Sequence, residues 1–324
     1  MAKTNREKLL AYFGKRQDEF ISGQQIADLL GCSRTAVWKH MENLRKEGYE
    51  IEAVRNKGYR LHVGKNQFSR DAILLGLKTS FIGQNMHVFE RVSSTQLVAH
   101  QEVSNGAESG TVIISDEQTK GKGRLLRPWD SQKGHGIWMS VILKPRIEIR
   151  RVPQFTFIAS LAVSEAINEV TGLEPRIKWP NDLYLGKKKI CGVLTEMQAE
   201  AETIHAVIIG IGVNVGQESF PEELRQKATS LRIEGGKNYS RQVLIQAILF
   251  YLEKYYLLFE SQGFQPIKLL WEERAIPFQQ RVRVSTLQGT ITGISKGISE
   301  EGVLLVEDDA GEIHPVYSAD IEIE

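Results

Sequence analysis

The first part of the chain has apolar residues at helical spacing, followed by a stretch in which apolar and polar residues alternate. Apolar residues recur every three or four positions in "ISGQQIADLLGCSRTAVWKHMENLRKEGYEIE", with a break at Gly31, which predicts two helices joined by a tight turn. Ser22 and Ser33 stand where these helices would begin, and a serine there can cap free backbone amides. The pattern then alternates in "YEIEAVRNKGYRLH" around a turn at residues 56–58, as in two antiparallel strands. With a further helix at "REKLLAYF", these elements predict a winged helix-turn-helix.

The outward face of the second predicted helix is polar and basic. The spacing predicts which residues face inward. These are Ile26, Leu29 and Leu30 in the first helix and Ala36, Val37, Met41 and Leu44 in the second. The outward residues of the second helix are Arg34, Thr35, Trp38, Lys39 and His40. Arg55, Lys57 and Arg60 on the wing are candidates for phosphate contacts. A winged helix places its second helix in the major groove, so we predict DNA binding rather than a protein-interaction domain with a solvated basic face.

Charge is distributed unevenly along the chain. The 324 residues carry a formal net charge of +1, but residues 1–64 hold twelve lysines and arginines and eight acidic residues, a net charge of +4. The remainder is therefore mildly acidic, at −3. A basic segment on a neutral body favours a nucleic-acid partner. No apolar run approaches a bilayer span and the N-terminus lacks a hydrophobic signal region, so we expect a cytoplasmic protein with no membrane partner.

Beyond a short polar linker at residues 63–68, strand-like and helical patterns alternate. Strands are predicted at "MHVFERV", "GTVIISDEQ", "GIWMSVIL", "PRIKWPNDLYL", "KICGVLTEMQ" and "TIHAVIIGIGVNV", and a long helix at "QFTFIASLAVSEAINEVTG". Several strands follow one another directly, which favours a mixed or largely antiparallel sheet with helices on one side. After a second long helix, "YSRQVLIQAILFYLEKYYLLFESQGF", glycine-separated alternation from Phe278 predicts a small SH3-like β-barrel.

The predicted fold class is thus α+β, in three parts. We expect a winged helix-turn-helix at residues 1–64, a mixed-sheet core at 65–276 and an SH3-like domain at 277–324. Cys32 and Cys191 lie far apart in apolar patterns, which argues against a disulfide or a cysteine metal site.

Nucleotide-binding fingerprints are absent from the sequence. It contains no phosphate loop of the form GxxxxGK[ST]. The glycines of "GIGVNVG" have the wrong spacing for a dinucleotide turn, and Pro221 interrupts the helix that would carry the pyrophosphate. Asn214, at the end of this predicted strand, can still present its amide to the heterocycle of a ligand.

The stretch "QTKGKGRLLRPWDS" is a candidate anion-binding loop. Glycines alternate in it with Lys120, Lys122, Arg124 and Arg127. Glycine lets backbone amides close on an anion, while the cations neutralise it, as an acyl-phosphate or a nucleotide phosphate requires. A mobile basic surface loop explains this stretch equally well.

The stretch "KWPNDLYLGKKKICG" places an acid and three lysines next to an apolar strand. By itself it predicts a hairpin whose lysines line a solvated edge. Alternation in the second strand puts Lys189 and Cys191 on one face and Lys188 and Gly192 on the other. Alternation alone leaves open which face lines a pocket.

Taken together, these motifs resemble a known family. "SSTQ", "QTKGKGR", "KWPNDLYL", "KKKICG" and "GIGVN" occur in the order and spacing of the biotin protein ligases of the bifunctional class, which also serve as the biotin operon repressor. A winged helix precedes them and a small β domain follows, so the resemblance covers essentially the whole chain. It implies a ligase that joins the carboxylate of biotin to the α-phosphate of ATP and passes the biotinyl group to a carrier lysine.

The resemblance also implies roles for particular residues. Lys189 and Arg124 would be catalytic, because they would hold charge between carboxylate and phosphate. The biotin site would contain Ser94, Thr95, Gln96, Gln118, Lys122, Gly123, Arg124, Lys189 and Gly192. The nucleotide site would contain Arg124, Arg127, Trp129, Lys189 and Asn214. Asp182, with help from Asn181, would position Mg²⁺ on the phosphates.

The implied partners are a biotin carboxyl carrier protein of acetyl-CoA carboxylase, operator DNA, and a second copy of the chain once the adenylate is bound. The chain departs from the family's loop, glycine-arginine-glycine-arginine-x-glycine-arginine, in having Lys122 for an arginine and Leu126 for the last glycine. A lysine lacks the bidentate fork and a leucine stiffens the loop. Two other functions compete: a transcription factor that only senses a ligand, and a ligase for lipoate or another acyl carrier.

Overall fold

The computed structural model describes residues 5–14, 16, 19–46, 49–62, 68–201, 203–286, 289–317 and 319–323. Contacts divide the chain into two compact units, Met1–Lys78 with Ser240–Gln246 and Thr79–Tyr239 with Ala247–Glu324. Of the linker predicted at 63–68, residues 63–67 lie outside the described residues. In the described part of the chain, no helix is both long and apolar enough to cross a bilayer.

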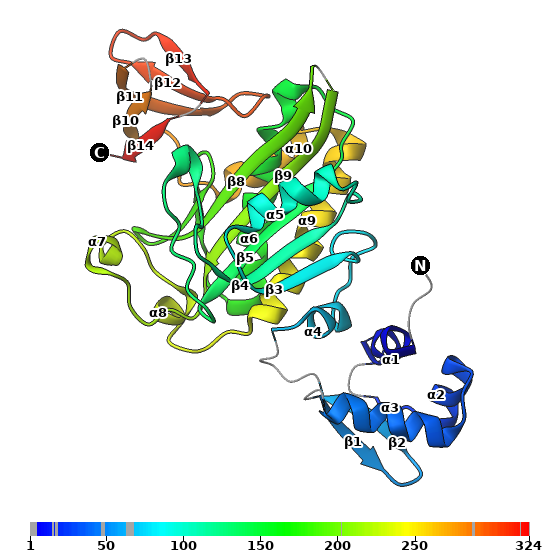
Figure 1. Ribbon diagram of the computed structural model, residues 1–324. Helices are drawn as coiled ribbons and strands as arrows, with labels where there is room; N and C mark the ends of the chain where they lie inside the picture. The colour runs from blue at the N-terminus through cyan, green and yellow to red at the C-terminus, as the bar shows by residue number, and fades with distance from the viewer. Residues whose placement is uncertain are drawn as a thin grey trace. The chain divides into compact units, whose positions relative to one another are not determined.

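The first unit contains the predicted helix-turn-helix and its wing, coloured blue in Figure 1. Its elements are α1 (Asn5–Gly14), α2 (Gly23–Leu30), α3 (Arg34–Lys46), β1 (Glu50–Val54), β2 (Gly58–His62) and α4 (Arg70–Leu75). β1 and β2 pair antiparallel, with Val54 opposite Gly58. The winged helix-turn-helix predicted from the sequence is confirmed.

Local signals set the boundaries of these helices. Gln25 N donates to Ser22 Oγ, and Ser22 N donates back to Gln25 Oε1 at 3.0 Å, so a capping box begins α2. Ala36 N donates to Ser33 Oγ at 3.2 Å at the start of α3. Gly31 follows α2 with a φ of 62°, a left-handed conformation that glycine adopts without steric cost. Both predicted caps are therefore present.

Two residues predicted on the inner faces are not buried: Ala36 is half-buried and Leu29 is exposed. α3 buries Val37, Met41 and Leu44. α2 buries Ile26, Ala27 and Leu30, whereas Leu29, expected inside, is 37% exposed. Ala27 takes the place of Leu29 in the core cluster of the unit.

The second unit is built on a seven-stranded mixed sheet. Its strands are β3 (Met86–Val92), β4 (Val112–Gln118), β5 (Gly136–Leu143), β6 (Arg176–Lys178), β7 (Asp182–Leu185), β8 (Lys188–Glu200) and β9 (Thr203–Asn214). The order is β3-β4-β5-β9-β8-β7-β6, with β3 and β4 parallel and the other neighbours antiparallel. The mixed sheet predicted from consecutive strands is confirmed.

Helices cover both faces of this sheet, whereas the sequence predicted them on one side. The remaining helices are α5 (Thr95–Ser104), α6 (Gln154–Thr171), α7 (Glu222–Arg225), α8 (Leu231–Gly235), α9 (Arg241–Gln262) and α10 (Gln265–Arg274), with single 3-10 turns at Arg124–Leu126 and Ile149–Arg151. α5 packs on Ile208. α6 bonds through Thr156 to Thr195, which pairs with Ile209 and so lies on the opposite face. Figure 1 shows α5 in front of the strands and α6 behind them.

The last part of the second unit is a five-stranded antiparallel sheet. Its strands are β10 (Arg281–Thr286), β11 (Gly289–Ile298), β12 (Leu304–Asp308), β13 (Ile313–Val316) and β14 (Asp320–Ile323). The order β13-β12-β11-β10-β14 leaves β13 and β14 at the edges, an open sheet consistent with the SH3-like prediction. Trp179 Nε1 donates to the Gly302 carbonyl at 3.0 Å and fastens this sheet to the core. A Cβ at Gly302 would lie 2.6 Å from Phe157 Cε2, so only glycine permits this approach.

Candidate active site

A cavity of about 680 Å³ lies where the N-terminal end of α5 meets β5, β8 and β9. Its lining includes every residue that the resemblance assigned to biotin, nucleotide, catalysis or metal. These residues are Ser94, Thr95, Gln96, Gln118, Lys122, Gly123, Arg124, Arg127, Trp129, Asp182, Lys189, Gly192 and Asn214. Segments spread over more than a hundred residues thus meet in one site.

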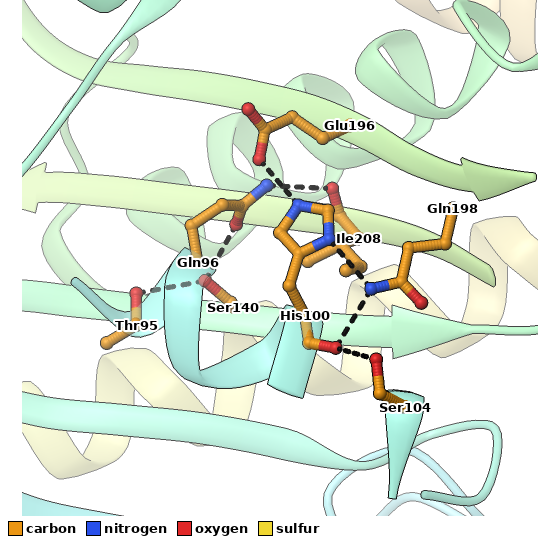
Figure 2. A network of polar contacts seen from close by, with 8 residues as sticks. All are labelled: Thr95, Gln96, His100, Ser104, Ser140, Glu196, Gln198 and Ile208. Atoms are coloured by element: carbon orange, nitrogen blue, oxygen red, sulfur yellow. Dashed lines mark hydrogen bonds and ion pairs between the residues drawn. The ribbon is translucent and has the colours of Figure 1, made fainter. Parts of the chain in front are cut away.

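Four polar side chains, the buried Thr95, Gln96 and Ser140 and the half-buried Gln118, form a polar floor in the cavity (Figure 2 draws three of them). Ser140 Oγ lies 2.9 Å from Thr95 Oγ1 and 2.8 Å from Gln96 Oε1. Gln96 Nε2 donates to the Ile208 carbonyl at 3.2 Å, and Thr95 N donates to Gln118 Oε1 at 2.8 Å. Because buried polar groups without partners are costly, this network fixes the side chains before a ligand arrives.

One turn further along α5, a second set of contacts holds the helix on β8 (Figure 2). His100 Nε2 lies 3.0 Å from Glu196 Oε2, and Gln198 Nε2 donates to the His100 carbonyl at 2.9 Å. Glu196 stands opposite Ile208 in the β8–β9 pair. Gln96 and His100 therefore hold α5 at the same position along the sheet, one through the Ile208 carbonyl and the other through Glu196.

Glycines on β8 and β9 leave room for a tryptophan on the cavity wall. A Cβ at Gly212 would lie 2.6 Å from Trp129 Nε1, and one at Gly192 would lie 3.2 Å from Trp129 Cζ3. Lys189 Nζ lies 5.2 Å from the centroid of the Trp129 ring, within the range of a cation–π contact. Trp129 Nε1 is buried and has no hydrogen-bond partner among the described residues. The indole therefore retains an unused donor.

The two predicted catalytic cations are each held by a neighbour in the "WPND" turn. Lys189 Nζ lies 2.7 Å from Asp182 Oδ1, and both side chains are mostly buried. Arg124 Nη1 donates to Asn181 Oδ1 at 3.3 Å, and Asn181 Nδ2 donates to the Val193 carbonyl at 2.8 Å. The turn thus places an ammonium and a guanidinium in the same cavity.

Burial changes the proton affinity of groups around this turn. It lowers the pKa of Arg124, while the nearby carboxylates of Asp182 and Asp320 raise it, and an arginine stays charged in either case. Burial also lowers the pKa of Lys178, and it raises the pKa of Tyr184 to about 12. At neutral pH Tyr184 is therefore an uncharged hydrogen-bonding group in the cavity wall.

A bulge in β8 brings Lys189 and Gly192 to one side of the strand, so the strict alternation predicted there is wrong. Two successive residues of β7 stand opposite Cys191 and Lys189, which leaves Ile190 as the extra residue. A Cβ at Gly192 would lie 3.3 Å from Lys189 Cε, whereas Cys191 is fully buried in the core. An inserted residue reverses the side-chain alternation. Lys189 still reaches the cavity, as expected.

The loop at residues 121–129 is a tight turn with two leucines at its tip. Gly123 N donates to the Arg127 carbonyl at 2.8 Å, and Arg127 N donates to the Arg124 carbonyl at 3.2 Å. Leu125 and Leu126 have φ values of 54° and 57°, and their side chains are 68% and 76% exposed. A left-handed conformation costs a residue other than glycine roughly 1–2 kcal/mol. Leu126 thus occupies a conformation suited to the glycine it replaces.

Several further residues line the cavity that sequence reasoning did not assign to it, among them Ser140, Lys178, Tyr184 and Asp320. A serine within the apolar run "GIWMSVIL" was a usable signal for the first. Lys178 and Tyr184 belong to the motif "KWPNDLYL". Lys178 stands opposite Asp182 in the β6–β7 pair, two positions from Tyr184, so the two side chains lie on the same face of the sheet. Asp320 gave no signal, because it lies 138 positions after Asp182 in the sequence and reaches the cavity only through the fold.

The surface predicted to meet DNA is largely accessible. Arg34, Thr35 and Lys39 on α3 are exposed, His40 is half-buried, and Trp38 is 53% exposed. Arg55 and Lys57 lie exposed at the wing turn, as predicted.

Two wing residues lie over the Phe20 ring, and one of them is also held by an ion pair. Lys57 Nζ lies 5.9 Å from the ring centroid. Arg60 bonds Glu52 at 2.6 Å and lies over the Phe20 ring at 4.5 Å from its centroid. It is therefore a weaker candidate for phosphate contact than Arg55 or Lys57.

Comparison with known proteins agrees with this architecture. The biotin/lipoate A/B protein ligase family matches residues 88–214, an HTH domain matches residues 5–60, and the biotin protein ligase C-terminal domain matches residues 279–323. The bifunctional ligase/repressor BirA of Bacillus subtilis is 50% identical over 325 residues, which covers 100% of both chains. The BirA of Escherichia coli is 28% identical, over 94% of this chain and 93% of that protein.

A solved structure of a biotin protein ligase also resembles this chain over most of its length. The biotin protein ligase from Aquifex aeolicus in complex with biotin and ATP superposes with a TM-score of 0.65 at 32% identity, and covers 74% of this chain and 99% of that one. With the winged helix, the cavity and the C-terminal sheet in the same order, the chain belongs to the family of bifunctional biotin protein ligases and repressors.

Proposed function

We propose that this cavity makes biotinyl-5′-AMP and that the adenylate serves both as the biotin donor and as the signal for repression. The observation that carries the proposal is the meeting of a neutral polar floor with two held cations, Lys189 and Arg124, in one cavity. The floor offers hydroxyl and amide groups that suit the ureido ring of biotin. The cations suit a carboxylate and an α-phosphate, which repel each other in their absence.

The reaction proceeds in two group transfers. An oxygen of the biotin carboxylate attacks the α-phosphorus of ATP, a new P–O bond forms, and the bond to pyrophosphate breaks. Negative charge gathers between the reacting groups, where Lys189 and Arg124 stabilise it. In the second step the amine of a carrier lysine attacks the acyl carbon, AMP leaves, and the amine loses a proton. We propose a biotin carboxyl carrier protein of acetyl-CoA carboxylase as that partner.

Asp182 is the proposed contact for Mg²⁺. Mg²⁺ typically takes one or two carboxylates and completes its shell with phosphate oxygens and water. Asp182 fits this pattern because Lys189 occupies only one of its oxygens in the described contacts. Asn181 fits less well, since its oxygen accepts from Arg124 and its nitrogen donates to Val193. A bound Mg²⁺ would neutralise the phosphates, while this chain's own groups orient the carboxylate.

The winged helix is the proposed operator reader. Its exposed residues Arg34 and Lys39 on α3, and Arg55 and Lys57 on the wing, suit base edges and phosphates. We propose that two copies of the chain associate when the adenylate is bound, because two half-sites read together bind DNA more tightly than one. Carrier protein, ATP and operator are all met in the cytoplasm, where we place the protein.

Pyrophosphate release tests the catalytic proposal. The protein is incubated with ATP, Mg²⁺ and either biotin or lipoate. Pyrophosphate release should depend on biotin and remain at background with lipoate. The polar floor offers hydrogen-bond partners for the ureido ring of biotin, and the dithiolane ring of lipoate has no N–H or C=O group to use them. Release driven by lipoate would identify an acyl ligase of another specificity. Binding of biotin without release would identify a sensor without catalysis.

A further inference from the structure

An ion pair joins the loop at residues 121–129, which we call the ligand loop, to the C-terminal sheet at the edge of the cavity. Arg127 Nη1 donates to Asp320 Oδ1 at 3.1 Å, and Arg127 Nη2 donates to Asp320 Oδ2, so the pair is bidentate. The partners stand 193 positions apart in sequence. Both line the cavity that holds Lys189 and Arg124. The C-terminal sheet therefore contributes a carboxylate to the candidate active site.

The loop backbone alone does not determine where the Arg127 side chain points. The described backbone bonds of this residue, to Gly123 and Arg124, fix its main chain within the turn. The side chain is 61% exposed, and Asp320 is its described side-chain partner. An exposed arginine without such a partner samples many rotamers. Asp320 thus selects the orientation in which the guanidinium lines the cavity.

The pair leaves Arg127 able to bind a further anion. A guanidinium carries five N–H donors in a fixed plane, and Asp320 takes one edge of it. The Asp320 hydrogen bond and charge raise the pKa of Arg127, and the same contact holds the pKa of Asp320 below its usual range. Both groups are therefore charged at neutral pH, with donors of Arg127 left over for phosphate oxygens.

We propose that Asp320 is a positioning residue for nucleotide binding, which acts by holding Arg127 toward the β- and γ-phosphates of ATP. This inference rests on the proposed function, in which the cavity binds ATP beside biotin. It assigns the C-terminal sheet a definite part in adenylation. Asp320 makes no contact with the nucleotide itself, so its effect passes entirely through Arg127.

The test is a double-mutant cycle on pyrophosphate release by the full-length protein. Arg127→Ala and Asp320→Ala should each raise the KM for ATP about fivefold, the size expected for one oriented charged contact, and leave the KM for biotin unchanged. In the Arg127→Ala background, Asp320→Ala should have no further effect on the KM for ATP. Asp320→Glu should restore most of the affinity, because a carboxylate is again present.

A matched control exists in the same sheet. Arg281 and Asp309 form a bidentate pair with both contacts at 2.9 Å, and neither residue lines the cavity. Asp309→Ala removes the same chemical group from the same domain. It should leave the KM for ATP unchanged, and a fivefold rise in this variant would mean that any damage to the domain has that effect, which overturns the assignment.

The outcomes separate this inference from the proposal beneath it. If Arg127→Ala raises the KM for ATP and Asp320→Ala does not, Arg127 binds phosphate without help and the inference alone is wrong. A lower KM in Asp320→Ala would show that Asp320 competes with phosphate, which also overturns it. An equal rise in both backgrounds would show an effect that bypasses Arg127. Absence of biotin-dependent release in the unmodified protein would instead refute the proposed function.

Discussion

Lys188 and Lys189 are neighbours in sequence with different surroundings. Lys189 Nζ lies 2.7 Å from Asp182 and 5.2 Å from the Trp129 ring centroid, inside the cavity, while Lys188 is not part of its lining. We expect Lys189→Ala to slow adenylate formation by about a hundredfold or more, as for loss of one preorganised donor. Lys188→Ala is the matched control and should keep near-normal turnover. Loss of turnover in Lys188→Ala with retention in Lys189→Ala would contradict the assignment.

Ser140 tests the polar floor at the level of one hydroxyl. Its Oγ contacts both Thr95 and Gln96, and it is fully buried. Ser140→Ala should cost about 1 kcal/mol of biotin binding, roughly a fivefold rise in the KM for biotin, with the KM for ATP unchanged. Ser164→Ala removes a buried hydroxyl from α6, which bonds only the Pro175 carbonyl among the described contacts, and serves as the control. Equal effects of the two variants on biotin would mean a loss of packing alone.

The role of a residue could be predicted from the sequence only where the residue belongs to a recognisable motif. Lys189 was found through "KKKICG", although the alternation used to describe its strand failed at Ile190, because no composition signal marks a bulge. Ser140 could have been found as a polar residue within a buried strand. Asp320 could not, since a lone acid in a predicted surface strand has many ordinary explanations.

Strand and helix positions follow closely from hydrophobic spacing. β5 and α6 occupy the segments predicted for them, because each is long, mostly apolar and bounded by glycine, proline or polar residues. The placement of α5 on the second face of the sheet was not predictable. Its N-terminal residues are polar and buried, and they satisfy one another only after β5 and β9 are in place.

One carboxylate ties α9 to the segment that precedes β3, and it predicts a pH-dependent stability. Burial raises the pKa of Glu253. Hydrogen bonds donated by Ser80, Phe81 and Ile82 lower it by more than burial raises it, so the net pKa lies below its ordinary value of 4.5. The unfolded chain then takes up this proton at higher pH than the folded one. The stabilisation is therefore full above the ordinary pKa and is lost as pH falls through the folded pKa.

Glu253→Gln should lower the free energy of unfolding at pH 7 by about 1–3 kcal/mol, since amide donors lose a charged acceptor. The difference from the unmodified protein should shrink below about pH 4.5. Denaturant unfolding at both pH values measures it. Glu273→Gln, at an exposed site on α10 whose side chain makes no hydrogen bond or ion pair in the described part of the chain, should change little at either pH. A constant difference across the pH range would mean that the carboxylate charge is not what stabilises this contact.

At the scale of the whole molecule, the proposed function couples a DNA-binding domain to an enzyme through one small molecule, the adenylate. The order of winged helix, ligase core and C-terminal sheet was predicted from the sequence and is confirmed. Boundaries at 64 and 276 stay predictions. The contribution of the C-terminal sheet to the cavity appears only in the folded protein, where Trp179 donates to Gly302 and Arg127 donates to Asp320 at the start of β14.

Operator binding under four conditions tests the central claim most directly. The full-length protein is titrated against operator DNA with no ligand, with biotin, with ATP and Mg²⁺, and with all three. Binding should tighten only when biotin, ATP and Mg²⁺ are present together, because only then is the adenylate made. Lys189→Ala should lose this tightening, and added biotinyl-5′-AMP should restore it at high concentration. Equal operator binding in all four conditions, or full tightening with biotin alone, would contradict the account.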